Sequence, residues 1–367
     1  MGSVLLLTWT MNQWVDVGGS RASNLIYGLA SKQGEQQTLV WEKPFDQRQW
    51  VKSAIENRIC PDLLILGSST IGALSQDMFK ERRTLNTFML GPTIEDFEAF
   101  FSILHQSSCI PRVVVIGIDP WFLNKNMNSD RWKSILYDYW RYHHQDGVFE
   151  HKIMLLNRFW SRFKENLSFV ATRESLKSFI HMRVNTNDSP KLVTASIHDI
   201  CQPSELQKYL KPGSQDLYLR EYDGHYETCP QLVPSEKEIQ GIAETYLIRN
   251  MHSMSNWHEV NNDTMARLKI LIEKFKENGS RVLLVVPPYH PITYALLHKD
   301  TMIKLNLEKM MSGLEEIANQ SSIGFINLQN PEVTGCSISS FNDSHHGGEK
   351  CVRRVAHFIL EYFDRSP

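Results

Sequence analysis

Four short runs of consecutive apolar residues constrain the fold more than any other feature of this sequence. They occupy residues 62–66, 112–117, 281–286 and 323–328, and the first three end at glycine or proline. Runs of this length without alternating polar positions are typical of parallel strands that are covered on both faces. The sequence therefore predicts a parallel sheet with helices on each side.

Segments with helix signals separate these runs. Thr93-Ile-Glu-Asp96 and Ser235-Glu-Lys-Glu238 have the hydroxyl-to-carboxylate spacing of a capping box. Residues 263–277 carry apolar side chains at helical spacing, and residues 349–363 form a terminal amphipathic segment. We expect helices after Thr93, from Ser235 to about residue 251, and over the two later segments. This alternation of strands and helices predicts the α/β class.

Residues 125–234 interrupt the alternation. We expect them to form a helical or irregular insertion that caps the carboxyl edge of the sheet. The surrounding α/β domain then covers residues 56–367, and residues 1–55 form a lead-in. The aromatic group between Trp121 and Tyr142 either packs as the small core of this cap or stacks on sugars.

The N-terminal segment and the overall charge exclude some classes of protein. Residues 4–9 are apolar except for Thr8, and no basic residue precedes Arg21. This run is too short for a secretory signal or a membrane span. It is either the remainder of a longer membrane anchor or an apolar element that packs on the domain. The 39 basic and 41 acidic residues give a net charge of −2, which argues against nucleic-acid binding.

The six cysteines show no CxxC or CxxH spacing, so we expect no zinc site. In a chain with room for a full core, we expect most of them to be buried free thiols. Cys201 and Cys229 flank a loop-like stretch and are the pair best placed for a disulfide.

Two segments carry residue types suited to nucleophilic catalysis. Ser69 follows the first predicted strand, close to the start of the next element, where backbone N–H groups can stabilise negative charge. Asp343 and His346 lie three residues apart before the terminal helix, a spacing that lets the carboxylate orient the imidazole. Each segment also has a simpler explanation. The serine loop is then only a turn, and Asp343 caps the terminal helix beside solvated histidines.

Together these segments resemble the SGNH/GDSL hydrolase superfamily. Gly67-Ser68-Ser69 matches the Gly-Asp-Ser block, with Ser68 in place of Asp, and Asn86-Thr-Phe-Met-Leu-Gly91 matches the second block. Asp343-Ser344-His345-His346 matches the final Asp-x-x-His block. The resemblance implies a flavodoxin-like three-layer sandwich. It also implies Ser69 as nucleophile, His346 as general base and Asp343 as its orienting group, with the N–H groups of Ser69 and Gly91 in the oxyanion hole.

One block departs from the family pattern. Gly117-Ile118-Asp119-Pro120 stands where the family has Gly-x-Asn-Asp, so Asp119 replaces an oxyanion-hole asparagine. An ionised carboxylate accepts hydrogen bonds and cannot donate one. Three outcomes follow from the sequence: Asp119 points away from the oxyanion, it is held protonated, or the protein is a poor hydrolase.

The Gly-Ser-Ser loop is closest to a divergent branch that serves acylation of cell-envelope polymers, such as the alginate acetylation proteins and the D-alanyl transfer protein of teichoic acid synthesis. This resemblance implies an extracytoplasmic, periplasmic or membrane-anchored site, with the cytoplasm as the alternative. It implies an acylated glycan as substrate, a membrane-bound acyltransferase as partner, and neither cofactor nor metal. Tyr289 and His290 in the Pro287–Pro291 loop, and Trp121 in the aromatic group, are the candidate substrate contacts. The alternative for the proline-rich loop is a purely structural role as a rigid loop.

Two alternatives remain open in the sequence. His345 competes with His346 for the role of base, although the family spacing favours His346. A serine-dependent acyl-ester hydrolase or O-acyltransferase competes with a catalytically decayed protein that binds carbohydrate or assists polysaccharide assembly.

Overall fold

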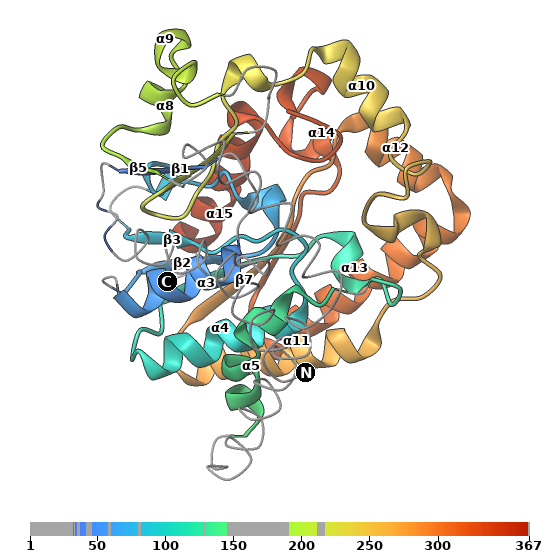
Figure 1. The fold of residues 1–367 in the computed structure, drawn as a ribbon. Helices are drawn as coiled ribbons and strands as arrows, with labels where there is room; N and C mark the ends of the chain where they lie inside the picture. The colour runs from blue at the N-terminus through green and yellow to red at the C-terminus, as the bar shows by residue number, and fades with distance from the viewer. Residues whose placement is uncertain are drawn as a thin grey trace, which may run out of the picture.

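The computed structural model describes residues 32, 34, 37–41, 46–57, 60–79, 82–127, 129–144, 191–210 and 217–365. The apolar segment at residues 4–9 lies outside these ranges. The centre of the molecule is a five-stranded parallel sheet in the order β3-β2-β4-β7-β8 (Figure 1). Its strands are β2 (Leu63–Leu66), β3 (Thr84–Asn86), β4 (Val113–Gly117), β7 (Arg281–Val286) and β8 (Gly324–Asn327). In chain order this is 2-1-3-4-5, so the predicted flavodoxin-like α/β fold is confirmed.

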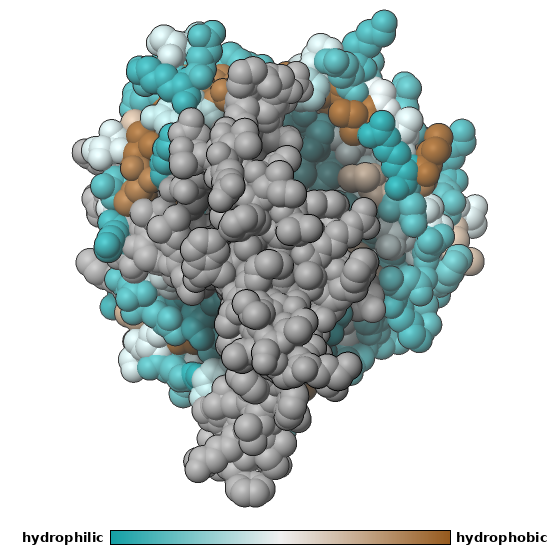
Figure 2. All heavy atoms as spheres, viewed as in Figure 1, coloured by the Kyte–Doolittle hydropathy of each residue, from teal (hydrophilic) through white to brown (hydrophobic). Residues whose placement is uncertain are grey.

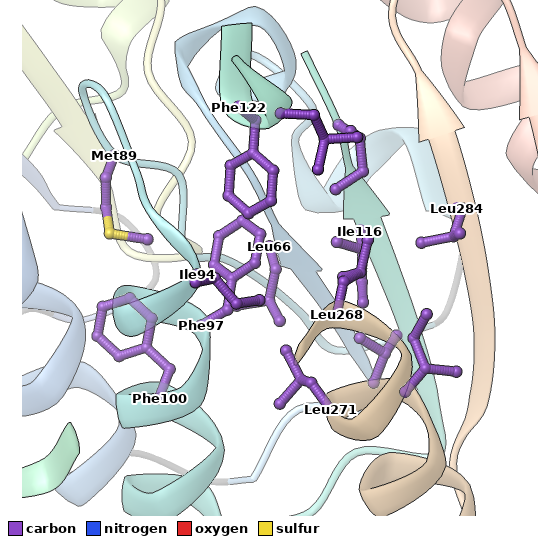
Figure 3. Packing of buried hydrophobic residues seen from close by; sticks show 14 of the residues in the cluster. Leu66, Met89, Ile94, Phe97, Phe100, Ile116, Phe122, Leu268, Leu271 and Leu284 are labelled. Atoms are coloured by element: carbon purple, nitrogen blue, oxygen red, sulfur yellow. The ribbon is translucent and has the colours of Figure 1, made fainter. Parts of the chain in front are cut away.

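Alternate residues of the central strands face opposite helix layers. Leu66, Ile116 and Leu284 lie on one face, against Phe97, Leu268 and other apolar residues of the covering helices (Figure 3). The helices of this layer are α3 (Gln47–Asn57), α4 (Ile94–Gln106), α11 (Asn262–Glu277) and α13 (Thr301–Ser321). Burial on both faces explains why these strands read as uninterrupted apolar runs in the sequence.

The opposite face of the sheet packs against α15 (Glu349–Arg365). Ile65, Val115 and Val285 contact Val355 and Ile359 of this helix in a second apolar cluster. The end of α15 that follows the Asp-x-x-His segment therefore lies next to the central strands. This packing holds the C-terminal part of the chain against the sheet that carries Ser69.

A smaller antiparallel sheet forms beside the central one, in the order β5-β1-β6. It consists of β1 (Thr38–Trp41), β5 (Lys191–Val193) and β6 (Tyr218–Glu221), with α8 (Ile197–Ile200) and α9 (Pro203–Leu206) packed nearby. Strand β1 precedes residue 56, and the expected boundary between residues 55 and 56 falls inside α3. Trp50 and Val51 of α3 are fully buried in the main core.

The described parts of the insertion, residues 125–234, pack against two different regions of the fold. Its aromatic segment forms η4 (Arg131–Ile135) and α5 (Leu136–His143), and α5 packs against α4. Trp132 and Tyr139 lie 4.8 Å apart between ring centroids, and Tyr142 meets Phe101 of α4 edge to face at 5.8 Å. These rings pack against each other and against the helix layer. The described end of the insertion, from β6 to Tyr226, instead lies beside the serine loop.

The expected length of the helix that begins at Ser235 was wrong. Helix α10 (Glu236–Glu244) ends well before residue 251, and the chain that follows reaches a left-handed backbone conformation at Asn250 and His252. The remaining helices include α12 (Pro291–Lys299) and α14 (Pro331–Thr334).

The expectation of free thiols was also wrong, because all six cysteines form disulfides: Cys60–Cys109, Cys201–Cys229 and Cys336–Cys351. The pairing of Cys201 with Cys229 agrees with the sequence. The other two pairs join residues that only the fold brings together.

On the face shown in Figure 2, exposed apolar side chains are scattered among hydrophilic ones. In the described ranges, every helix falls short of the length and apolarity that a membrane crossing requires.

Candidate active site

The serine loop begins where β2 ends. Gly67 packs so closely that a Cβ atom there would lie 2.4 Å from Ile71 and 3.1 Å from the carbonyl of Gly117. The Ser68 hydroxyl accepts a hydrogen bond from the N–H of Thr70 (3.1 Å) and caps the short helix η1 (Ser69–Ile71). These contacts fix the loop at the carboxyl edge of the sheet, and they leave Ser69 partly exposed.

The histidine loop lies between η7 (Ile338–Ser340) and α15. The Oδ1 atom of Asp343 accepts hydrogen bonds from the N–H groups of His345 and His346, both at 2.8 Å. Phe341 and Gly347 form an antiparallel bridge across the loop. The Cys336–Cys351 disulfide closes the chain on either side of it. The loop is therefore held by its own backbone before any contact with the serine.

The structure brings Ser69, His346 and Asp343 into one hydrogen-bonded line. The Nε2 atom of His346 lies 2.7 Å from Ser69 Oγ, and its Nδ1 atom lies 2.5 Å from Asp343 Oδ2. Because an ionised carboxylate only accepts, Nδ1 carries the proton and Nε2 is left to accept from the serine hydroxyl. These are the contacts that a serine nucleophile, a general base and an orienting carboxylate need.

The electrostatic interaction between His346 and Asp343 stabilises the charged form of each group. Burial disfavours the imidazolium of His346, but the charge and hydrogen bond of Asp343, together with the charge of Asp119, outweigh it and raise the pKa of His346. Burial also opposes the ionisation of Asp343, yet the adjacent histidines lower its pKa. The pair therefore favours an ionised carboxylate beside an imidazole that readily takes up a proton.

His345 faces away from Ser69. Its Nε2 atom lies 3.3 Å from Nε2 of His252, and its Nδ1 atom lies 3.0 Å from the hydroxyl of Ser344. Burial and the charge of His346 lower the pKa of His345 well below its usual value. Of the two histidines that compete for the role of base, His346 is therefore the one in hydrogen-bond contact with Ser69.

Two backbone N–H groups are available as oxyanion donors. In the described part of the chain, neither the N–H of Ser69 nor that of Gly91 has a hydrogen-bond partner. Gly91 has a φ of +57°, a conformation that favours glycine. Helix α3 holds this segment, because Arg48 donates to the carbonyl of Gly91 (3.3 Å) and Gln47 accepts from the N–H of Leu90 (2.7 Å).

Asp119 does not take the position of an oxyanion donor. Its Oδ2 atom accepts hydrogen bonds from the hydroxyls of Ser68 (2.5 Å) and Thr70 (3.1 Å), and the residue is buried. Burial raises the pKa of Asp119 to about 6, against the opposing effects of the two hydroxyls and of His346. At neutral pH the group is therefore mainly ionised and acts as an acceptor.

Asn86, the first residue of the second sequence block, holds the serine loop through hydrogen bonds of its side chain. Its Nδ2 atom lies 2.9 Å from the carbonyls of both Ile71 and Leu74, and its Oδ1 atom accepts from the N–H of Phe88 (3.0 Å). One side chain thus ties the serine loop to the segment that leads to Gly91.

The three expected substrate contacts lie beneath the site. Trp121, Tyr289 and His290 are at most 1% exposed, so they have essentially no surface with which to meet a glycan in this structure. Trp121 stacks on His252, and Tyr289 stacks on His345. His290 caps α12 by accepting the N–H of Ile292 at 3.2 Å. Their observed contacts support the histidine loop and α12.

Two groups at the site were not identified from the sequence. His252 lies in a segment whose backbone is left-handed at Asn250, His252 and Ser253. It packs between Trp121 and His345, and burial lowers its pKa to about 4. Nothing in the sequence around His252 indicates this conformation.

The second group is the turn that carries Asp223 and His225. The Nδ1 atom of His225 lies 2.6 Å from Asp223, and both side chains are buried. The adjacent Tyr226 donates its N–H to the carbonyl of Gly72 (3.0 Å) and its hydroxyl to that of Ser69 (3.3 Å). The spacing Asp-x-His could have been noticed in the sequence, but it fits many turns.

Asp343, His345 and His346 are also the described residues whose donor atoms lie close enough together for a metal ion. Both ring nitrogens of His346 and both of His345 already have hydrogen-bond partners within the protein. Hydrogen bonding among the side chains therefore accounts for this cluster.

In comparisons with known proteins, the chain matches no family model, no curated protein and no solved structure. A functional assignment therefore depends on the geometry of the site.

Proposed function

We propose that this protein is a serine-dependent acyl-ester hydrolase or O-acyltransferase of the SGNH type. The observation that carries the proposal is the 2.7 Å contact between His346 Nε2 and Ser69 Oγ, with Asp343 on the other nitrogen of the same ring. These groups come from the loop after β2 and from the loop before α15, 277 residues apart in the chain. Such a meeting of nucleophile, base and orienting group is the arrangement used for acyl transfer.

The proposed reaction has two steps. Ser69 Oγ attacks the acyl carbon while its proton moves to His346 Nε2, and the N–H groups of Ser69 and Gly91 bind the oxyanion. The ester C–O bond then breaks, and the leaving alcohol takes the proton from His346. In the second step, water or a sugar hydroxyl gives a proton to His346 and attacks the acyl-serine. The products are the free acid or a new ester, and Ser69 recovers its proton.

We propose an acylated cell-envelope glycan as the substrate and an extracytoplasmic location. The three disulfides support the location, because such bonds persist mainly in oxidising compartments. The partial exposure of Ser69 at the sheet edge is consistent with a polymeric substrate. In the transfer version of the reaction, a membrane-bound acyltransferase is the proposed partner that supplies the acyl group.

The test is labelling with a fluorophosphonate, followed by mapping of the modified peptide, together with turnover of p-nitrophenyl acetate. We expect the label on Ser69, and we expect Ser69→Ala to lose both labelling and turnover. Ser339→Ala, which removes an exposed hydroxyl outside the site, is the matched control and should behave as wild type. Labelling of Ser69→Ala at the wild-type rate would end the proposal.

A second candidate function is carbohydrate binding without catalysis. Asp119 favours it, because the carboxylate stands where the SGNH pattern has a donor, and loss of one oxyanion donor typically lowers the rate about 100- to 1000-fold. This candidate predicts no covalent label on wild-type protein but measurable binding to acylated oligosaccharides. Titration calorimetry with an acetylated oligosaccharide, run beside the labelling experiment, separates the two functions.

A further inference from the structure

The two departures from the SGNH pattern meet in a single contact. Position 68 has a serine where the pattern has an aspartate, and position 119 has an aspartate where the pattern has an asparagine. In the structure, Ser68 Oγ and Asp119 Oδ2 lie 2.5 Å apart. A carboxylate just after β4 therefore contacts a hydroxyl at the position where the pattern has a carboxylate.

The contact extends to both neighbours of the nucleophile. Thr70 Oγ1 lies 3.1 Å from the same Asp119 oxygen and 3.0 Å from Ser68 Oγ. The N–H of Thr70 donates to Ser68 Oγ as well. Ser68, Thr70 and Asp119 thus form a triangle of oxygen atoms that involves both chain neighbours of Ser69. Each hydroxyl donates its one proton to Asp119, so the Ser68–Thr70 edge is a contact between two oxygen atoms. All three residues are at most 9% exposed, so water competes little with these bonds.

The far end of the triangle is rigid. Asp119 lies two residues after the end of β4 and is the N-cap residue of the short helix η3 (Pro120–Leu123). Ile118, between β4 and Asp119, donates its N–H to the carbonyl of Val285 on β7 (2.8 Å). A carboxylate fixed to the central sheet therefore holds the residues on both sides of Ser69.

We propose that Asp119 is a positioning residue, whose carboxylate clamps the hydroxyls on both sides of Ser69 to the end of β4 and so sets the direction of the Ser69 hydroxyl and N–H. This inference rests on the proposed function, because it assumes that Ser69 is the nucleophile. It explains why an acceptor stands at position 119: two donors need it there. In this arrangement, the oxyanion hole consists of the N–H groups of Ser69 and Gly91.

The charge of Asp119 has a second effect on His346. The titratable groups that face Asp119 are His346 and the buried phenols of Tyr246 and Tyr289, whose raised pKa values keep them neutral. The ring of His346 is also faced by Asp343 and by the neutral His345 and His252. Asp119 thus adds negative charge beside an imidazole that becomes cationic during the reaction, and it raises the pKa of that imidazole.

The first experiment compares Asp119→Asn with Asp119→Ala, using the pH dependence of fluorophosphonate labelling. Asparagine keeps an acceptor oxygen for Ser68 and Thr70 but loses the charge. We expect it to retain labelling and to move the acid limb of the pH profile to lower pH by about half a unit. Alanine removes the acceptor, and we expect the maximum labelling rate to fall by about tenfold or more.

The second experiment exchanges the two positions. Ser68→Asp alone places two buried carboxylates in contact and should lower the melting temperature by several degrees. Combining it with Asp119→Asn restores one carboxylate and one neutral partner, and we expect at least half of the lost melting temperature to return. This measurement needs no catalytic activity, so it tests the contact even if Ser69 is not labelled.

The outcomes separate the two proposals. Absence of label on wild-type Ser69, with recovery of stability in the double variant, removes the proposed function and leaves a purely structural contact. Label on Ser69, with wild-type rate and pH profile in Asp119→Ala, removes the positioning role alone. A double variant no more stable than Ser68→Asp also counts against the clamp, because it shows that the two positions are not coupled.

Discussion

Two histidine–aspartate pairs lie beside the serine loop, and they differ in what the second ring nitrogen meets. In both pairs Nδ1 lies against a carboxylate, at 2.5 Å for His346 with Asp343 and at 2.6 Å for His225 with Asp223. His346 turns Nε2 toward Ser69 Oγ. The His225 side chain instead hydrogen-bonds to Asp223, whose carboxylate also accepts the N–H of Gln76 (2.6 Å).

The comparison teaches that a histidine–aspartate contact is not in itself a catalytic feature. The pair of Asp223 and His225 fastens the turn after β6 to the serine loop, and the carbonyl of Asp223 accepts the N–H of Asn86 (2.6 Å). Burial opposes the charge on His225, but Asp223 raises its pKa to about 9, so this imidazole is already protonated at neutral pH. A protonated histidine cannot act as a base, whereas His346 has a serine to accept from.

The largest expected difference between the pairs is in activity. His346→Gln removes the base and should lower fluorophosphonate labelling by about 1000-fold or more. His225→Gln keeps a hydrogen-bonding side chain, and labelling should fall by less than about tenfold, because this pair acts only through packing of the turn. Labelling rates of the two variants, measured at pH 8 on protein shown to be folded by circular dichroism, make the test. Equal losses would mean that both pairs serve the chemistry.

The disulfides provide a second test of the comparison, because the Cys336–Cys351 disulfide encloses Asp343 and His346. Removing Cys336–Cys351, which closes a separation of 15 residues, should cost about 3 kcal/mol of folding free energy. Removing Cys60–Cys109, with a separation of 49 residues, should cost about 4 kcal/mol. The order should reverse for activity, since the shorter ring holds Asp343 and His346 in a loop, whereas the longer ring holds Ser69 next to the paired strand β2. Double serine variants, compared by urea unfolding and by labelling, test this reversal.

The pair at residues 223–225 should show its effect in stability. The folded pKa of His225 lies above the usual 6.5, so its contribution is fully present below pH 6.5 and is lost as the pH rises through about 9. The lowered pKa of Asp223 makes its contribution present above pH 3.8 and lost in acid. Wild type should therefore exceed His225→Gln by up to about 3 kcal/mol between pH 4 and 6.5. Thermal unfolding across this range checks the difference, and a gap that widened above pH 9 would contradict it.

The smallest expected effect is the position of the acid limb of activity. His346 must be neutral to accept the proton of Ser69, and Asp343 raises its pKa. The labelling rate of wild type should therefore rise with pH through a midpoint above 6.5, and His225→Gln should leave that midpoint unchanged. A midpoint at or below 6.5 would show that burial outweighs the carboxylates around His346.

The central sheet could be predicted from the sequence because its strands are buried on both faces. Strands β2 and β4 contain no polar side chain, and β7 and β8 contain one each, Arg281 and Asn327, at an end of the strand. No tertiary information is needed to recognise these runs. Strand β3 was missed, since Thr84–Asn86 has only three residues and two of them are polar. The sheet formed by β1, β5 and β6 was missed because its strands pair across more than 150 residues.

The residues of the site likewise fall into those that local sequence patterns reveal and those that depend on tertiary contacts. Ser69, Asp343 and His346 could be proposed because their spacing within each segment reflects local geometry, and the structure brings them together. The acceptor role of Asp119 depends on hydroxyls 49 and 51 residues away, which no local pattern reveals. The burial of Trp121, Tyr289 and His290 and the pairing of most cysteines likewise depend on packing between distant elements.

The ring closed by Cys336 and Cys351 has a practical consequence for anyone who prepares this protein. Thiol reagents would open the segment that presents the His346 imidazole, and they would also open the ring from Cys60 to Cys109 that contains β2 and Ser69. Material purified with dithiothreitol would then be less stable than the oxidised protein, and its Ser69 would lack a fixed imidazole partner. An inactive preparation of this kind says nothing against catalysis until it has been reoxidised and assayed again.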